Sequence, residues 1–407
     1  MSESQRWLTI LGIGEDGVEG LSASARSLLM EADKIIGGRR HLAGLDARIS
    51  GERLPWPRPF SDPAAWVRRH QSRSVVVLAS GDPFDYGVAT QLVEAFSMRE
   101  IFCIPSPSAF SLACSRLGWA RHRTQTMSFC GRPIEPLVRA LHPGQRIIAL
   151  SADSATPAAV AKCLIQRGFG RSRLHLLECL GGPRERITSQ FADELGEREI
   201  EALNVVAVEV EVGANCDARI IPLSCGLDDA CFEHDGQITK REIRAITLSA
   251  LAPRAGELLW DVGCGSGSVS IEWLMRHGAN KAIAIESNSE RARRAARNAL
   301  ALGTPELVIV EGRAPGALAD LPTPDAVFLG GCAHSPDLIE TTWRSLRLGG
   351  RIVANAVVVE TEAALIAAQG QYGGTLSRLS VERFECIGQF HAFRPAMMVT
   401  QWCAEKS

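Results

Sequence analysis

Two glycine-rich loops, one in each half of the chain, constrain the fold because each lies between a strand-forming run and a helical pattern. The first loop ends the stretch 8–14, and a helical pattern follows over residues 22–32. The second begins in the stretch 258–263, and its helical pattern continues through Met275. A strand, a tight loop and a helix in this order begin a βαβ unit. Since 407 residues also exceed one ordinary domain, we predict two α/β domains.

Apolar runs of strand length alternate with helical periods between these two loops. This alternation is typical of βαβ units and predicts mostly parallel sheets. The strand-like runs cover residues 75–79, 101–104, 147–150, 174–177 and 205–210, and the helical ones cover residues 89–96 and 155–166.

An aperiodic stretch that contains Pro222, Gly226 and several aspartates interrupts this alternation and predicts the domain boundary. We expect an N-terminal domain over residues 1–212, a linker over residues 213–232 and a C-terminal domain over residues 233–407.

Local signals also predict the ends of elements in the second domain. Capping boxes at residues 239–242 and 287–290 predict the starts of two helices, with Thr239 and Ser287 as their N-cap residues. Two late extended runs, 381–387 and 397–402, predict an antiparallel hairpin at the edge of an otherwise parallel sheet.

Charge and composition exclude several classes of protein. A net charge of −2 argues against a nucleic-acid partner, which normally requires a basic surface. The N-terminus shows no signal peptide, and no apolar run reaches the ~20 residues of a membrane span, so we expect a cytoplasmic protein without a membrane partner. The 12 cysteines include no C-x-x-C pair, which indicates reduced thiols, and Cys332 with His334 alone does not predict a metal site.

The stretch Asp261-Val-Gly263-Cys-Gly265-Ser-Gly267 is the most informative motif. Glycines allow a ligand to approach the backbone, and unpaired amides at a helix start favour an anionic group. Asp261 ends the strand before the first glycine, where a carboxylate suits a ligand ammonium. Glu286 ends the next strand about 20 residues later, where a carboxylate accepts ribose hydroxyls. A ligand with an amino acid at one end and a ribose at the other is S-adenosylmethionine.

The residues around this motif resemble the class I methyltransferase fold and, more specifically, the decarboxylating precorrin methyltransferase family. The resemblance covers most of residues 233–407 and is carried by residues 236–245, 259–273, 328–331 and 354–357. It departs from many relatives at Arg313, where they carry an acid. The motif itself predicts a cofactor contact at Asp261. The resemblance implies further cofactor contacts at Thr239, Gly263, Cys264, Gly265, Ser266, Gly267, Glu286 and Ala314.

The N-terminal half resembles the tetrapyrrole (corrin/porphyrin) methylase family over roughly residues 6–212. Three stretches carry this likeness: residues 11–17, 75–87 and 104–118. The resemblance implies a bilobal fold with the methyl donor in the cleft and the 12–17 loop on the substrate side. Glu15 replaces the usual proline after G-x-G, and Ser106 replaces a usual glycine. The implied donor contacts are Ser80, Gly81, Asp82, Ser108 and Ala109.

Both domains in this order resemble the family of decarboxylating precorrin C5,15-methyltransferases. The resemblance implies cobalamin biosynthesis, with S-adenosylmethionine methylating carbons 5 and 15 of a precorrin-6 type tetrapyrrole and loss of the carbon-12 acetate carboxylate. By likeness, the N-terminal domain methylates carbon 5 and the C-terminal domain performs the other two steps. We expect a homo-oligomer. Glu272 and Asn355 are candidate substrate contacts. Two structural roles are equally good interpretations: a buried helix carboxylate for Glu272 and a strand-end cap for Asn355.

Two other functions remain open at this point. An RNA or protein class I methyltransferase with an accessory domain would show a basic face and an aromatic or N-P-P-Y acceptor box, and neither is evident. A protein that only senses the cofactor would bind it without turnover. Neither domain shows a nucleophile–base pair, and methyl transfer to carbon does not require one, because the sulfonium provides the leaving group.

Overall fold

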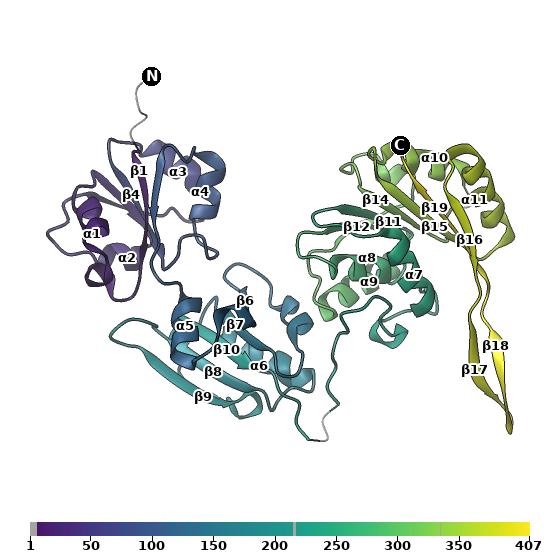
Figure 1. The fold of residues 1–407 in the computed structure, drawn as a ribbon, viewed down its shortest axis with the longest axis horizontal. Helices are drawn as coiled ribbons and strands as arrows, with labels where there is room; N and C mark the ends of the chain where they lie inside the picture. Colours follow the sequence, from purple (N-terminus) through teal and green to yellow (C-terminus); the bar gives the residue numbers. More distant parts are fainter. Residues whose placement is uncertain (1–5, 215–216, 334) are drawn as a thin grey trace. The chain divides into compact units, whose positions relative to one another are not determined.

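The computed structural model describes residues 6–214, 217–333 and 335–407, which form two compact α/β units (Figure 1). The first contains the chain up to Arg219 except for Glu135–Arg139, and the second contains that short segment and the chain from Ile220 on. The predicted α/β fold class is confirmed. Residues 220–232 of the predicted linker belong to the second unit. Within the described ranges, no helix is long and apolar enough to span a lipid bilayer.

The first lobe of the N-terminal unit contains a five-stranded parallel sheet of order β3-β2-β4-β1-β5. Its central strands are buried on both faces, which explains their continuous apolar runs. The strands are β1 (Leu8–Ile13), β2 (Lys34–Gly37), β3 (Glu52–Pro55), β4 (Val75–Ser80) and β5 (Ile101–Ile104), and the helices are α1 (Ala23–Met30), α2 (Arg39–Ala43), α3 (Pro63–Arg69) and α4 (Ala89–Ala95).

The second lobe contains a five-stranded mixed sheet of order β6-β7-β10-β8-β9, in which β6 and β7 pair in parallel and the other three pairings are antiparallel. The prediction of mostly parallel sheets is wrong for this lobe. Only the short segment 179–185 joins β8 to β9, and a parallel pair requires a longer crossover. The elements are α5 (Ala109–Leu117), β6 (Thr124–Ser128), β7 (Arg146–Leu150), α6 (Thr156–Gln166), β8 (Arg173–Glu178), β9 (Arg186–Phe191) and β10 (Asn204–Glu209).

The C-terminal unit contains a seven-stranded sheet of order β13-β12-β11-β14-β15-β19-β16, parallel except that β19 runs antiparallel to both of its neighbours. Its strands are β11 (Leu258–Val262), β12 (Lys281–Glu286), β13 (Val308–Glu311), β14 (Ala326–Gly330), β15 (Arg351–Ala356), β16 (Thr375–Leu379) and β19 (Val399–Glu405). Its helices are α7 (Arg241–Leu251), α8 (Ser268–Leu274), α9 (Ser289–Ala301), α10 (Pro336–Ser345) and α11 (Val359–Tyr372).

The predicted late hairpin pairs differently from the expectation. The run 381–387 forms β17 (Glu382–Ile387), which pairs with β18 (Phe390–Pro395) in a separate two-stranded ribbon that extends from the unit (Figure 1). The other run becomes β19, which lies inside the large sheet. The cause is the two-residue turn between Ile387 and Phe390, in which Gly388 has a φ of +62°.

The two predicted capping boxes are also wrong in detail. Helix α7 begins at Arg241 without a side-chain cap, and the Thr239 carbonyl instead accepts a hydrogen bond from Arg244. Helix α9 is capped by Asn288, whose side chain accepts the amides of Glu290 and Arg291, one residue beyond the predicted cap. Asparagine satisfies two free amides there, which a serine at 287 does not reach.

Candidate functional site

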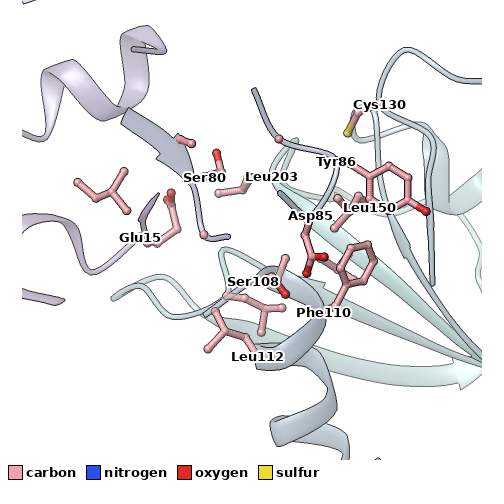
Figure 2. A pocket seen from close by; sticks show the side chains of 18 of the residues that line it. Glu15, Ser80, Asp85, Tyr86, Ser108, Phe110, Leu112, Cys130, Leu150 and Leu203 are labelled. Carbon is pink, nitrogen blue, oxygen red and sulfur yellow. The ribbon is translucent and has the colours of Figure 1, made fainter. Parts of the chain in front are cut away.

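A cavity with a volume of about 420 Å³ lies in the N-terminal unit and is lined by residues of both lobes (Figure 2). This volume is within the range of small-molecule binding sites. Figure 2 shows Glu15 and Ser80 on one side of the cavity and Tyr86, Leu150 and Cys130 on the other. The lining comes from the ends of β1 and β4, the start of α5 and the inner strands of the second lobe.

Close backbone contacts shape the first-lobe wall of this cavity. A Cβ atom on Gly12 would lie 2.1 Å from the Gly81 carbonyl oxygen, so the end of β1 approaches the loop after β4 this closely only because Gly12 has no side chain. Gly81 has a φ of +57°, and its own Cβ would lie 2.9 Å from the Pro107 oxygen. Ser106 donates a hydrogen bond from its hydroxyl to the Gly12 carbonyl at 2.8 Å, which gives this departure from the family a structural role.

Four of the five residues that the sequence predicts as N-terminal donor contacts line this cavity. These are Ser80, Gly81, Ser108 and Ala109. The fifth, Asp82, is not among the lining residues, because its carboxylate accepts the Phe84 amide at 2.9 Å and closes the turn. Ser108 caps helix α5 by accepting the Ser111 amide at 3.3 Å. Their contacts with the donor stay predictions.

A polar cluster of Glu15, Arg40, His41 and Ser80 forms one part of the cavity wall. Arg40 forms an ion pair with Glu15 and donates from Nη2 to Ser80 at 3.3 Å and to His41 Nε2 at 3.1 Å. Burial, and then the charge of Arg40, lower the pKa of His41 to about 4, so this ring is neutral at pH 7. Since arginine only donates, His41 Nε2 accepts and the ring proton resides on Nδ1.

Sequence reasoning missed Arg40 and His41. They lie on the short helix α2, outside every glycine-rich motif, and no fixed spacing connects them to the β1 or β4 loops. Only the position of β2 next to β4 in the sheet brings them to Ser80.

The second candidate site lies at the carboxyl ends of β11 and β12 in the C-terminal unit. Gly263, Gly265 and Gly267 have φ values of +75°, +58° and +75°, a backbone conformation that favours glycine. The Gly265 amide donates to Glu286 Oε2 at 2.9 Å, and Glu286 Oε1 accepts the Asn288 amide at 2.9 Å. The structure thus brings the glycine loop and the predicted ribose acceptor into direct contact.

Asp261 is fully buried below this loop. Its Oδ2 accepts hydrogen bonds from the Ser270 amide at 3.1 Å and the Ser270 hydroxyl at 2.6 Å, whereas Oδ1 has no partner among the described residues. Burial raises the pKa of Asp261 to about 6. The Ser266 hydroxyl is also buried without a described partner. Unpaired buried polar atoms beside an open glycine loop are a signal for a polar ligand.

The remaining predicted cofactor contacts lie around the same loop. The Gln237 carbonyl, two residues before Thr239, would be 3.6 Å from a Cβ on Gly265. The Gly312 amide donates to the Glu286 carbonyl at 2.9 Å, which brings the segment that contains Ala314 next to β12. Cys264 is buried, and burial holds the pKa of its thiol well above the usual range, so it is a neutral, small side chain.

Glu272 lies on helix α8 and is fully buried. Its carboxylate accepts the amides of Gly226 at 2.6 Å and Leu227 at 3.0 Å, and it forms a buried ion pair with Arg244 at 2.6 Å. These contacts match the buried helix carboxylate that the sequence left as an alternative. Substrate contact by Glu272 stays a prediction.

Asn355 lies at the carboxyl end of β15 in a buried polar cluster. Its Nδ2 donates to Thr247 Oγ1 at 2.9 Å, and its Oδ1 accepts from Gln401 at 2.9 Å. The cluster joins α7, β15 and β19. Both polar atoms of the amide therefore have partners within the protein, and substrate contact by Asn355 also stays a prediction.

No group of three or more histidine, cysteine or carboxylate side chains in the described ranges is arranged to hold a metal ion. His334, one member of the pair with Cys332, lies outside the described residues. Cys332 donates from Sγ to the Val262 carbonyl at 3.1 Å, and burial raises its pKa to about 12.

Comparison with known families identifies both units. Residues 8–196 match the Tetrapyrrole (Corrin/Porphyrin) Methylases, and residues 230–406 match the Precorrin methyltransferase domain. A bilobal methylase and a glycine-loop domain of the class I type in one chain define a two-domain methyltransferase. More specifically, the chain belongs to the family of decarboxylating precorrin-6Y C(5,15)-methyltransferases. It is 48% identical over 396 residues to the protein of that name from a Sinorhizobium species, which covers 97% of this chain and 95% of the relative.

Two shorter relatives match parts of the chain. A cobalt-precorrin-7 C(5)-methyltransferase from Salmonella typhimurium is 32% identical over 181 residues, which cover 44% of this chain and 88% of the relative. A probable cobalt-precorrin-6B C(15)-methyltransferase (decarboxylating) from Saccharolobus solfataricus is 32% identical over 154 residues, which cover 36% of this chain and 77% of the relative. The two named activities thus occur in separate proteins elsewhere.

Proposed function

We propose that this chain acts in cobalamin biosynthesis on a precorrin-6 type tetrapyrrole. It transfers methyl groups from S-adenosylmethionine to carbons 5 and 15, removes the carbon-12 acetate carboxylate and forms a precorrin-8 type product. The observation that carries this proposal is the match to the decarboxylating C(5,15) relative over 97% of the chain. The rival function, methylation of RNA or protein, is not favoured, because the relatives are named as precorrin enzymes and the net charge is −2.

We infer one S-adenosylmethionine site in each unit. In the C-terminal unit, the unpaired Oδ1 of Asp261 and the loop 263–267 fit the amino-acid end of the donor, and Glu286 fits its ribose. In the N-terminal unit, Ser80, Gly81, Ser108 and Ala109 line a cavity large enough for a small molecule. Bound there, the donor supplies an electrophilic methyl group on a sulfonium.

The protein's contribution to both transfers is mainly alignment. In this proposal, fixed loops hold the donor methyl in line with the acceptor carbon. The acceptor carbon is nucleophilic because the reduced macrocycle donates electrons through its enamine-like system. Loss of carbon dioxide leaves an electron pair that the same macrocycle delocalises, so decarboxylation needs no electron-accepting cofactor.

We assign carbon 5 to the N-terminal unit and carbon 15 with decarboxylation to the C-terminal unit. The shorter relatives support this division, since a C(5) enzyme and a decarboxylating C(15) enzyme exist separately. The C(15) relative is named for cobalt-precorrin-6B and the C(5) relative for cobalt-precorrin-7. We therefore infer that the C-terminal unit acts first.

We also propose that the chain assembles as a homo-oligomer through the β17–β18 ribbon. Phe384, Phe390 and Phe393 on this ribbon are 62%, 78% and 66% exposed. An isolated two-stranded ribbon is marginally stable in water, and a second copy covering these rings would stabilise it. Light scattering after gel filtration should show more than one chain per particle, and a monomer would contradict the proposal.

One incubation tests the enzymatic proposal. The full chain is given metal-free precorrin-6 type substrate and S-adenosylmethionine with a labelled methyl group. We expect a product with two labelled methyl groups, at carbons 5 and 15, and one molecule of carbon dioxide per product, because each unit has its own donor site. Mass spectrometry and carbon-13 NMR measure both. A product with one methyl group at saturating donor, or without loss of carbon dioxide, would contradict the proposal.

A further inference from the structure

We propose that Glu15 is the base that accepts the proton released when carbon 5 is methylated in the N-terminal cavity. This assignment rests on the proposed function of that unit. It adds a catalytic residue to a site for which the family resemblance implies donor contacts and a substrate-side loop but no proton acceptor.

Charge balance requires that a proton leave the acceptor. The S–CH3 bond of the sulfonium breaks and its electron pair stays on sulfur, which becomes neutral. The new C–CH3 bond uses an electron pair of the macrocycle, and the methylated carbon then carries both a methyl group and its original hydrogen. Breaking that C–H bond returns its electrons to the macrocycle and restores conjugation. The proton that leaves in this last step needs an acceptor within hydrogen-bond reach.

Glu15 offers such an acceptor in the cavity where we propose that the transfer takes place. It belongs to the loop after β1, lines the cavity, and points toward the Ser80 side of the wall in Figure 2. Its carboxylate forms an ion pair with Arg40, and the same guanidinium donates to Ser80 at 3.3 Å. Arg40 therefore holds the carboxylate next to the residues proposed to contact the methyl donor.

The backbone around Glu15 is fixed by the second lobe. A Cβ on Gly182 would lie 2.6 Å from the Glu15 Cβ, so the loop after β8 contacts Glu15 without room for a larger residue. The Glu15 side chain keeps 20% of its surface exposed. A carboxylate that is held in place and keeps part of its surface free in a cavity is suited to accept a proton. An ion pair at an open surface, in contrast, would contribute little even to stability.

Besides Glu15, the cavity wall holds one histidine and one further carboxylate as rivals for this role. The neutral His41 ring has one acceptor atom, Nε2, which already accepts from Arg40, whereas Glu15 has a second carboxylate oxygen besides the one that pairs with Arg40. Asp85 lies beside Phe110 in Figure 2, away from the Arg40 cluster. The experiment therefore compares Glu15 with Asp85.

The test uses the full chain carrying Glu15→Gln, which keeps the size of the side chain and removes the negative charge. We expect the rate of carbon-5 methylation to fall at least about 100-fold. Decarboxylation and carbon-15 methylation belong to the other unit and should continue at the wild-type rate, so the singly methylated, decarboxylated species accumulates. With deuterium on carbon 5, the isotope effect on product formation should be larger in Glu15→Gln than in the wild type.

Controls separate catalysis from folding. Glu194→Gln removes an exposed carboxylate that pairs with Arg171 outside the cavity, and it should leave all three steps unchanged. Binding of S-adenosylhomocysteine by Glu15→Gln should stay within about threefold of the wild type, a difference of less than 1 kcal/mol. Glu15→Asp keeps a carboxylate and should retain more carbon-5 activity than Glu15→Gln at equal binding, which a purely structural role does not predict.

Three outcomes would overturn the assignment: a carbon-5 rate within threefold of wild type in Glu15→Gln, loss of that rate in Asp85→Asn instead, or equal loss in Glu15→Asp and Glu15→Gln together with lost S-adenosylhomocysteine binding. If the wild-type chain adds no methyl group to carbon 5, the proposed function fails instead. The two failures are thus distinguishable.

Discussion

At the scale of single residues, the two acids of the C-terminal site have different surroundings. Glu286 accepts two backbone amides, one on each oxygen, so its charge is stabilised locally. Asp261 has one oxygen without a described partner and is fully buried, so its charged form is penalised. Both were predicted from the same motif, but only the structure shows this difference, because it depends on Ser270 and on the depth of the strand end.

The raised pKa of Asp261 predicts a pH dependence of stability. Its folded-state pKa of about 6 exceeds the ordinary value of 3.8, so the folded protein binds this proton more tightly than the unfolded chain. The free energy of unfolding of the wild-type protein, measured relative to that of Asp261→Asn, should therefore fall by a total on the order of 3 kcal/mol as the pH rises from about 4 to about 6. Above this range the difference should stay level. Urea denaturation of both proteins at several pH values measures this difference. A difference that grows with pH would contradict the assignment.

At this scale, the sequence predicted which motif residues lie close together, and their contacts with the cofactor stay predictions. The glycines at 263, 265 and 267 and the acids Asp261 and Glu286 come together as expected, because strand ends and a helix start fix their positions. Arg40, which lies in no motif, could not be predicted as a site residue, since its place in the cavity depends on the order of strands in the sheet.

At the scale of elements, the segment 220–232 is part of the C-terminal fold. Gly226 and Leu227 donate their amides to Glu272 on α8, and Arg244 on α7 completes this buried cluster. The cluster fixes the start of α7, because the same arginine donates to the Thr239 carbonyl. The lack of sequence periodicity predicted a linker here. The hydrogen bonds that order the segment could not be predicted from it, because they come from a residue about 45 positions away.

A comparison of fragments tests this role. Residues 220–407 should be more stable than residues 233–407, because the shorter fragment leaves Glu272 without two backbone donors. Hydrogen bonds to charged groups contribute roughly 1.5–3 kcal/mol each, so we expect a loss of at least about 3 kcal/mol. Urea denaturation gives the two values. As a control, Glu272→Gln should cost less in the shorter fragment than in the longer one, and equal costs would argue against the coupling.

Strands were predicted well where they are continuous and buried. The run 75–79 appears as β4, and the run 101–104 as β5, with ends that differ by at most one residue. Pairing was harder to predict, because it depends on connections. The turn at Gly388 pairs β17 with β18, and β19 is then free to enter the sheet between β15 and β16.

At the scale of the whole molecule, the chain is two methyltransferase units with separate candidate sites. Each unit has its own hydrophobic core and sheets. The division of the chain into two halves followed from the two glycine-rich loops alone. The order in which the two sites act does not follow from these loops, because it depends on the chemistry of the substrate.

The proposed division of labour predicts the products of the separated units. Residues 220–407 with substrate and donor should give a species with one added methyl group and one carboxylate fewer. Residues 1–219 should methylate that species once more and release no carbon dioxide, because only the C-terminal unit matches a decarboxylating family by our assignment. Mass spectrometry distinguishes the two products. Carbon dioxide released by residues 1–219 would overturn the division while leaving two methyltransferase units.

By our proposal, the chain has two donor sites, and these would connect the enzyme to the methylation state of the cell. Each transfer leaves S-adenosylhomocysteine, which competes with fresh donor at the loop around Gly265 and at the cavity next to Ser80 alike. The two proposed sites belong to units of different fold, so their affinities for the spent donor need not match. When S-adenosylhomocysteine accumulates, the site that binds it more tightly is inhibited first. The ratio of singly to doubly methylated corrinoid then reports the cellular ratio of S-adenosylhomocysteine to S-adenosylmethionine.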